Sequence, residues 1–415
     1  MTGQPSAARP GRPGLGGRFW TLWSAFAASN LGDGLTLVAF PLLAVAVTDD
    51  ARLVALVTAF RFLPFLVVGL PAGVVLDRVG RQRMAVVAQA ARLAAVVLLV
   101  AATATDRASI TVLAVAAFVV GVGEVFTDGA VPALVRDVVD DDQLELANAR
   151  LATAEPVTNM ILGPPVGALL FELDPAAPFV AAAALFALSA GGLARLTGTY
   201  RPSPEDRLPV SLAEVTIGLR YVWAHPVLRP LAMAVALFSF VGAAIQAVLV
   251  ILATERLGLG GLGFGVLLAA GAVGSILMSF GVAPFVRRAG HAASMRLAVV
   301  TFSLSYLTLG LTTSLGVAMV ASAVAGVAAP AWNVVSSTVR QRLVPDEIFG
   351  RMMTAYLFLA WSMQPLGAAL AGAVAERWGT QWVFVFAALA VGSLLVTGRP
   401  LFARLTEAMA GDPAR

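Results

Sequence analysis

The sequence predicts an all-α membrane protein with twelve transmembrane helices in two groups of six. Hydrophobic residues make up 59% of the 415 residues, charged residues make up only 13%, and the mean hydropathy is +0.86. A soluble globular protein is about 25% charged and about 45–50% apolar. This composition therefore argues against a soluble enzyme, a nucleic-acid-binding protein and a disordered chain. The net charge of +4 does not change this interpretation, because the charges lie in short breaks between long apolar runs.

The apolar runs are long enough to cross a bilayer, since a hydrocarbon core about 30 Å thick needs about 20 residues of helix. Spanning strands would alternate apolar and polar residues, and the runs do not alternate. Backbone groups in lipid must be hydrogen-bonded internally, which leaves helices. The expected spans of the first group are 19–47, 53–76, 84–104, 109–134, 149–171 and 177–197, and those of the second group are 227–253, 264–286, 294–313, 316–339, 353–375 and 381–399.

The remaining segments complete the expected domain organisation. The N-terminal tail is rich in Pro, Gly and Arg, and we expect a disordered cytoplasmic tail rather than a signal peptide. In the central loop, apolar residues recur at helical spacing, which predicts a short amphipathic helix on the inner membrane surface. The expected order is a tail 1–17, a six-helix bundle 18–197, a central loop 198–226, a second bundle 227–399 and a cytoplasmic tail 400–415.

Arginine placement predicts the orientation of the chain in the membrane. With both termini in the cytoplasm, the external breaks hold only Arg52, Arg107, Arg256 and Arg377, and most of the 28 arginines lie on the cytoplasmic side. Positively charged residues are enriched in cytoplasmic loops. We therefore expect both termini in the cytoplasm and the chain in the cell (plasma) inner membrane.

The two groups of spans echo one another. Pro165-Val-Gly-Ala in the fifth span parallels Pro365-Leu-Gly-Ala in the eleventh, and Val135-Arg136 parallels Val339-Arg340. These matches predict two six-helix pseudo-repeats. In transporters with parallel repeats, the substrate site lies at the repeat interface near the bilayer midplane.

The sequence after the second span, Gly73-Val-Val-Leu-Asp77-Arg78-Val-Gly80-Arg81, resembles the loop 2–3 signature of the major facilitator superfamily. The twelve spans, the central loop and the duplicated positions extend this resemblance over nearly the whole chain. The resemblance implies the major facilitator fold, alternating access and a cytoplasmic conformational latch. The residues of this implied latch are Gly73, Asp77, Arg78, Gly80, Arg81 and Arg136. The alternative interpretation is a charge cluster that only sets topology.

The fifth span contains Gly163-Pro164-Pro165-Val-Gly167, which resembles the core of a motif shared by superfamily antiporters. The upstream glycines of that motif are absent, because Asn159 and Arg150 stand at those positions. Proline removes a backbone hydrogen bond and clashes with the preceding turn, so the segment should be kinked. The resemblance implies a bend that favours export. The alternative is ordinary packing of small residues between helices.

Three short patterns refine the resemblance. They are Asn30-Leu-Gly-Asp33, Arg61-Phe-Leu-Pro64 and the span-four sequence from Gly121 to Asp128. Together they resemble the branch that contains enterobactin-type siderophore exporters and macrolide or multidrug efflux proteins. Lysophospholipid carriers look similar and remain an alternative.

Ionisable residues inside the membrane are costly and by default mark a functional site. Counting along the helices at 1.5 Å per residue places Asp33 and Arg61 in an upper layer and Glu124, Asp128, Arg92 and Glu155 in a lower one. Four acids face two arginines, so two acids lack a cationic partner, and a buried carboxylate takes up a proton. The candidates for proton coupling are Asp33, Arg61, Glu124, Asp128 and Glu155.

Each charged residue also has a structural interpretation. Asp33 and Arg61 could form a permanent ion pair, and Asp128 and Glu155 could be solvated in an inner vestibule. Arg92 lies on an expected peripheral helix and would then be a structural partner. The second half offers only neutral groups at depth and should form an apolar, aromatic-lined wall. The candidates for the substrate cavity are Asn30, Phe126, Asn159, Gln246, Trp332, Asn333 and Gln364.

The sequence favours a secondary transporter over an enzyme. It contains 0 Cys and 2 His, no phosphate-binding loop and no cluster of metal ligands. We expect a proton-coupled antiporter that exports a lipophilic small molecule such as a drug, a secondary metabolite or a siderophore. The expected partners are the bilayer, the substrate and protons, with no cofactor, metal, nucleic acid or obligatory protein partner. The alternatives are an uptake or facilitated carrier of a metabolite or lysophospholipid, and a non-transporting receptor or scaffold.

Overall fold

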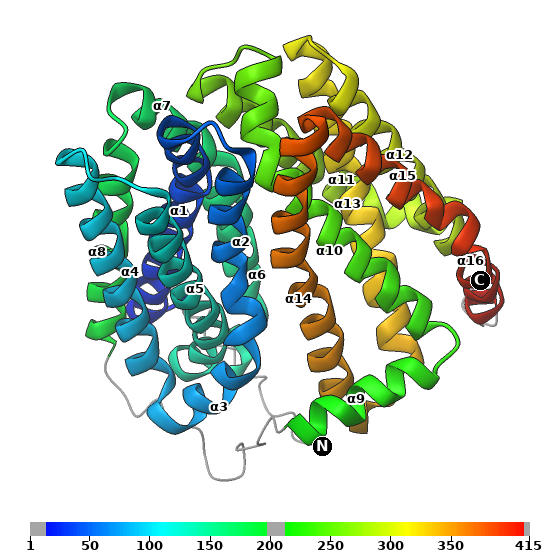
Figure 1. Cartoon of the computed structure of the whole chain (residues 1–415). Helices are drawn as coiled ribbons and strands as arrows, with labels where there is room; N and C mark the ends of the chain where they lie inside the picture. The colour runs from blue at the N-terminus through cyan, green and yellow to red at the C-terminus, as the bar shows by residue number, and fades with distance from the viewer. Residues whose placement is uncertain (1–13, 197–211, 411–415) are drawn as a thin grey trace, which may run out of the picture.

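The structure, a computed structural model, describes residues 14–196 and 212–410, and the elements in this part of the chain are all helical (Figure 1). Ten of the described helices are long and apolar enough to cross a membrane. They are α1 (Gly17–Val47), α4 (Arg81–Ala104), α5 (Ile110–Val138), α8 (Ala177–Arg195), α10 (Leu228–Ile251), α11 (Gly261–Ala289), α12 (His291–Leu311), α13 (Leu315–Leu343), α14 (Asp346–Trp378) and α15 (Thr380–Thr397). Each coincides with one of the expected spans.

The two remaining expected spans, 53–76 and 149–171, are interrupted helices. The first consists of α2 (Ala51–Val67) and α3 (Gly69–Val79), with the break at Val68. Pro71 explains this break, because a proline has no N–H to donate and its ring clashes with the carbonyl four residues earlier, which is that of Val67.

The second interrupted span consists of α6 (Leu144–Glu155), the π-helical segment η2 (Pro156–Leu162) and α7 (Gly163–Leu173). Pro164 and Pro165 remove two donors at the start of α7, and the turn before them widens, with the amide of Gly163 bonded to the carbonyl of Thr158. The segment in which a kink is expected therefore contains a π-helical turn directly before the prolines.

Four shorter elements complete the described part of the chain. A 3-10 turn, η1 (Asp141–Gln143), precedes α6, and a π-turn, η4 (Leu252–Arg256), continues α10 to the end of its span. The expected loop helix is α9 (Leu212–Ala224), which packs against α14. The segment 400–415 was expected to be a tail, but α16 (Arg399–Ala410) occupies most of it. Its buried Leu401, Phe402 and Leu405 explain why it folds back onto α12.

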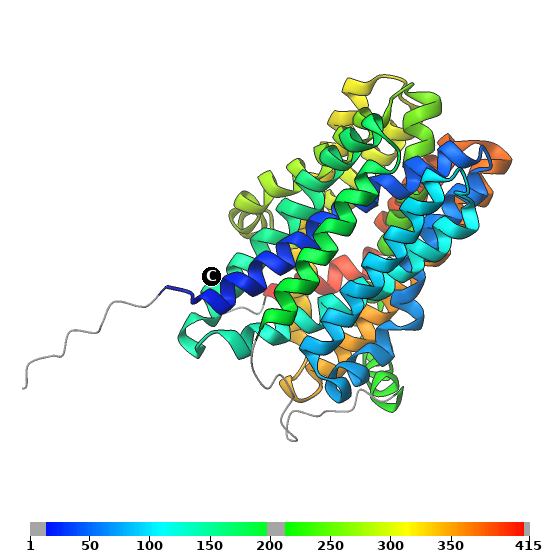
Figure 2. The same ribbon diagram turned by 90° about the vertical axis from the view of Figure 1, so that its left-hand side faces the viewer.

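The helices form two bundles that lie side by side (Figure 1), and Figure 2 shows the first bundle from its outer side. Helices α1, α4, α5 and α8 pack together in the first half, and α10, α11, α12, α13, α14 and α15 pack together in the second. The halves meet where α2 lies against α14 and where α7 lies against α11. We call the end at which α1 and α10 begin the terminal end. The opposite end, which carries the turns 48–50, 174–176 and 257–260, is the distal end.

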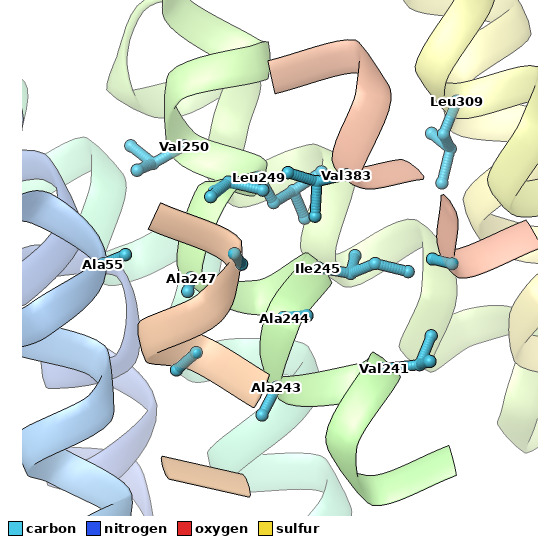
Figure 3. Close-up of a cluster of buried hydrophobic side chains, with 14 of the residues drawn as sticks. Ala55, Val241, Ala243, Ala244, Ile245, Ala247, Leu249, Val250, Leu309 and Val383 are labelled. Carbon is cyan, nitrogen blue, oxygen red and sulfur yellow. The ribbon is translucent and has the colours of Figure 1, made fainter. Parts of the chain in front are cut away.

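An apolar cluster joins the two halves. It includes Ala55 of α2 and the α10 residues Ala243, Ala247 and Val250, all less than 9% exposed (Figure 3). Small side chains let helices of different halves approach closely, which is how helices associate where lipid provides no hydrophobic driving force. The buried core of the molecule therefore continues across the interface between the bundles.

Candidate functional site

Four charged side chains from four helices meet inside the first half. Asp33 lies on α1, Arg61 on α2, Arg92 on α4 and Glu124 on α5. Arg92 Nη2 forms an ion pair and a hydrogen bond with Asp33 Oδ1. Arg61 Nη2 lies 3.6 Å from Asp33 Oδ1 and 3.0 Å from Glu124 Oε2. The cluster is therefore a chain in which Arg92 contacts Asp33, and Arg61 lies between Asp33 and Glu124.

Arg92 is held rigidly in this cluster. Its side chain is fully buried, its Nη1 donates a hydrogen bond of 3.0 Å to Ser29 Oγ, and Gln89 Nε2 donates to the same oxygen at 2.7 Å. The guanidinium carbon lies 4.1 Å from the centroid of the Phe186 ring, a cation–π contact. A Cβ at Gly123 would collide with the Arg92 side chain, so the glycine makes room for it. These contacts fix the Arg92–Asp33 pair.

Arg61 is less constrained than Arg92. Its side chain is 8% exposed, and its Nη1 has no hydrogen-bond partner among the described residues. The helix carrying it is interrupted one turn beyond Pro64. Arg61 Nη2 faces two carboxylates at once, and one cation cannot fully neutralise both. Its guanidinium therefore bridges Asp33 and Glu124.

Exposure separates the five candidates for proton coupling. Asp33 and Arg61 are buried, Glu124 is 19% exposed at its side chain, and Asp128 and Glu155 are exposed. In the described part of the chain, no arginine lies within 4.0 Å of the carboxylate of Asp128 or Glu155. Asp128 follows Glu124 by one helical turn on α5, so the two share a face. A row of carboxylates thus extends from the buried cluster to exposed positions on α5 and α6.

The two-layer arrangement expected from counting residues is wrong for Arg92 and Glu124. Both were assigned to a lower layer, yet they contact Asp33 and Arg61 of the upper layer. Counting along a helix axis ignores helix tilt and the length of the arginine and glutamate side chains. The ion pair considered between Asp33 and Arg61 is present at 3.6 Å, and Arg92 is a second and closer partner of Asp33.

The expected latch is only partly within the described residues. Gly73, Asp77 and Arg78 lie on α3, but their side chains are outside the described part of the chain. Gly80 joins α3 to α4 with φ 98°, a left-handed conformation that favours glycine. Arg81 begins α4, and Arg136 is exposed in the last turn of α5. The latch remains a prediction.

The kink residues lie between α1 and the second half. Gly163 packs directly against Gly34, and a Cβ at Gly167 would lie 2.8 Å from the carbonyl oxygen of Leu35. On the other side, a Cβ at Gly265 of α11 would lie 2.7 Å from the carbonyl oxygen of Pro164. Pro165 is half-buried. The segment therefore contacts α1 next to Asp33 and the opposite half at the same time.

The residues expected to line a substrate cavity lie in both halves and differ in burial. Asn30 and Phe126 are buried in the first half, and Asn30 Nδ2 donates to the carbonyl of Phe26 at 3.0 Å. Asn333 is exposed, and Asn159, Gln246 and Gln364 are half-buried. Two cavities of about 370 Å³ lie at the distal end, and a third of about 150 Å³ lies on α10, α14 and α15. None of the seven expected residues lines these three cavities.

Trp332 belongs to an aromatic group in the second half. Its ring centroid lies 4.5 Å from that of Phe238, which is 5.2 Å from that of Phe302, which in turn is 5.8 Å from that of Tyr306. The spacing of four residues between Phe302 and Tyr306 on one helix was a usable signal for this group. Phe238, Phe302 and Tyr306 are functional candidates that the sequence analysis did not single out.

No metal site accompanies these residues in the described part of the chain, where no three His, Asp or Glu side chains are placed to hold an ion. In the described part of the chain, the cluster is a network of ion pairs and hydrogen bonds.

Known proteins resemble this chain over most of its length. A family described as transmembrane secretion effector, a family of the major facilitator superfamily, matches residues 13–412. The multidrug efflux pump Tap of Mycolicibacterium fortuitum is 30% identical over 392 residues, covering 90% of this chain and 92% of that protein. Tap of Mycobacterium tuberculosis strain ATCC 25618 / H37Rv is 28% identical over 377 residues, covering 87% of each chain.

Solved structures share the fold. A nucleoside transporter has a TM-score of 0.76 at 13% identity and covers 94% of this chain and 99% of its own. A bacterial homologue of the human lysosomal transporter Spinster, in an inward-facing and occupied conformation, has a TM-score of 0.72 at 15% identity, covering 95% and 98%. The chain therefore belongs to the transmembrane secretion effector family and is a multi-pass membrane transporter of the major facilitator superfamily, not an enzyme.

Proposed function

We propose that this transporter exports a lipophilic small molecule from the cytoplasm by alternating access, with inward proton flow as the energy source. Its relatives that are multidrug efflux pumps support the outward direction of transport and a broad substrate class. A drug, a secondary metabolite or a siderophore fits this class. No cofactor is required, since the proton gradient supplies the energy.

The proposal includes twelve spans in two six-helix repeats. Ten long apolar helices support this count, and the interrupted segments α2–α3 and α6–η2–α7 would supply the other two crossings. The matching Pro-x-Gly-Ala sequences at 165–168 and 365–368 lie in α7 and α14 and support the repeat. The arginine distribution supports a cytoplasmic terminal end with both termini in the cytoplasm and the chain in the cell membrane.

The observation that carries the coupling is the position of Arg61 between two carboxylates. Asp33 has Arg92 as a partner besides Arg61, whereas Glu124 has Arg61 as its single ion-pair partner in the described part of the chain. When Arg61 shifts to Asp33, Glu124 loses its cation in a low-dielectric surrounding and takes up a proton. Glu124 is therefore the exchanging acid, and Asp128 and Glu155 form its path to water.

Alternating access then couples proton and substrate. Arg61 lies on α2, which packs against α14 of the other half, so a movement between the halves changes the position of Arg61 relative to the cluster. Substrate and proton act on the same equilibrium between two conformations of the transporter, so binding of either one changes the populations available to the other. This is the thermodynamic requirement for antiport.

Everted membrane vesicles test this function. Compounds found by a susceptibility screen of expressing cells are added to energised vesicles, and the pH gradient is followed with a fluorescent acridine. The account predicts substrate-dependent dissipation of the gradient with wild-type protein and none with Glu124→Gln. Glu145→Gln is the matched control, because Glu145 is exposed on α6. Substrate entry that stops at equilibrium, without proton movement, would instead indicate a facilitated carrier.

A further inference from the structure

Carboxylates at the distal end join the two halves by capping helices of the opposite half. Glu172 lies near the end of α7 in the first half, and its Oε1 accepts a hydrogen bond of 2.8 Å from the backbone amide of Leu262, the second residue of α11. Gly260, which precedes α11, provides no side-chain cap. Because the first amides of a helix have no partner within the helix, Glu172 supplies a cap that α11 does not carry itself.

The second contact runs in the opposite direction. Glu376 lies near the end of α14 in the second half, and its Oε2 accepts a hydrogen bond of 3.2 Å from the amide of Ala51, the first residue of α2. Asp50 caps the next amide, that of Arg52, so the two carboxylates share the end of α2. Arg52 Nη2 is 4.0 Å from Glu376 Oε1 but is 60% exposed and bonded to Asp50, and it contributes little to this contact.

The two contacts are equivalent by the proposed repeat. Helices α7 and α14 carry the parallel Pro-x-Gly-Ala sequences, and each bears its capping glutamate after that sequence. The capped helices α2 and α11 belong to the second and eighth expected spans, which also correspond. Each half therefore gives one cap and receives one. Two independent contacts with the same chemistry on corresponding elements point to a shared role.

Glycines bring the backbones together at both contacts. A Cβ at Gly372 of α14 would lie 2.7 Å from Ala55 Cβ and 2.9 Å from Arg52 Cα. A Cβ at Gly260 would lie 2.9 Å from Glu172 Oε1, and one at Gly265 would lie 2.6 Å from Ala168 Cβ. The glutamates can reach the amides only while the halves are this close, so separating the halves at the distal end must break both caps.

We propose that Glu172 and Glu376 form a reciprocal gate that holds the distal end closed, and that both caps break when this end opens. The positive end of each helix dipole attracts the carboxylate of the opposite half, and this attraction fades within about one turn. The gate rests on alternating access in the proposed function. It does not depend on which ion drives transport.

The distance between the halves, measured by electron–electron resonance of spin labels, tests the gate directly. The chain has 0 Cys, so labels can be placed without removing native residues. Arg107→Cys and Thr313→Cys place one label on each half at the distal end, and Glu145→Cys with Glu347→Cys do so at the terminal end. These four positions are exposed. The protein is used full-length in lipid nanodiscs.

Removing the caps should shift the population toward a long distal distance. We expect the ratio of open to closed molecules to rise about threefold in Glu172→Ala or Glu376→Ala and about tenfold in the double variant, since each cap acts on the same equilibrium. The terminal distance should shorten in the same molecules. Glu172→Gln and Glu376→Gln keep an acceptor without the charge and should give smaller shifts, and they test the gate if an alanine variant does not fold.

Glu255→Ala is the control, because Glu255 is an exposed carboxylate at the distal end without a hydrogen bond or ion pair in the described part of the chain. This control should leave the distribution unchanged. A double variant with the wild-type distal distribution would overturn the gate. Distal opening without any proton movement in the vesicle assay would retain the gate and reject proton coupling, so the two proposals fail separately.

Discussion

Replacing Arg92 with leucine should destabilise the first bundle by about 3 kcal/mol or more. Arg92 is fully buried and Asp33 is 5% exposed at its side chain, so the substitution leaves a carboxylate in an apolar surrounding. Breaking a buried ion pair from one side costs about 3–5 kcal/mol. The lower part of this range applies because Arg61 remains 3.6 Å from Asp33. The loss of the contact with the Phe186 ring adds about 0.5–2 kcal/mol.

A double-mutant cycle separates the pair from its surroundings. Arg92→Leu, Asp33→Asn and the combined variant are unfolded in mixed micelles, with the fluorescence of the 7 tryptophans as the signal. The combined variant removes both charges, so its loss of unfolding free energy should be smaller than the sum of the losses in the two single variants. We expect a coupling energy of about 2–3 kcal/mol, near the upper limit for residues in contact.

The matched control is Arg83→Leu, the same substitution at an exposed position of the same helix α4. It should change the free energy of unfolding by no more than about 0.5 kcal/mol. A coupling energy between Asp33 and Arg92 below about 0.5 kcal/mol would refute the fixed pair. Arg92 would then be unable to hold Asp33, and the assignment of Glu124 as the exchanging acid would lose its basis.

Three further predictions follow from single contacts. Gly34→Ala should destabilise the protein by about 1–3 kcal/mol, because the new Cβ would collide with the backbone of Asn159 and Gly163. Gly191→Ala is the control, since its Cβ would meet nothing within 4 Å. Thermal unfolding of the two variants measures the difference. Arg61→Gln should abolish pH-driven transport while leaving the Arg92–Asp33 pair and the fold intact, and normal pH-driven transport would exclude Arg61 from coupling. Burial lowers the pKa of His225, and its Nδ1 accepts hydrogen bonds from the amides of Val227 and Leu228 at 3.2 and 3.3 Å. The neutral ring therefore stabilises the folded state. This contribution is present above the pKa of His225 in the unfolded chain and is lost as the pH falls through its lower pKa in the folded protein. Titration by NMR in a His291→Gln background checks this, and a His225 pKa above 6.5 would contradict it.

The helices could be predicted from the sequence because each long apolar run must satisfy its own backbone in lipid. The ten long helices coincide with expected spans, and the proline pair at 164–165 located the irregular fifth span. The break at Val68 was missed, although Pro71 indicates it. The proline ring clashes with the carbonyl four residues earlier, so the helix is expected to be interrupted there. Helix α16 was missed because its three buried apolar residues have meaning only beside α12.

The members of the charged cluster could be predicted, but not their pairing. Ionisable residues inside long apolar runs pointed to Asp33, Arg61 and Glu124. Their partners depend on helix rotation and side-chain reach, which residue counting does not contain. Ser29 lies one turn from Asp33, and Gln89 lies one turn from Arg92, so shared helix faces could have indicated the polar support of the pair.

The contacts between the halves were beyond sequence reasoning. Glu172 and Glu376 lie near the ends of apolar spans, where a carboxylate is ordinarily a solvated boundary residue. Their role depends on the docking of α7 against α11 and of α2 against α14, pairs that are far apart in the chain. Gly260 and Gly372 indicate close contact between the halves only once the residues that face them are known.

Substrate-induced proton release from the purified transporter tests the central claim most directly. The protein is placed in weakly buffered detergent solution with a pH indicator, and a compound identified by the susceptibility screen is added. If Glu124 gives up its proton when substrate binds, the wild-type protein will acidify the solution and Glu124→Gln will not. Saturable binding of the compound without any change in pH would contradict proton-coupled export.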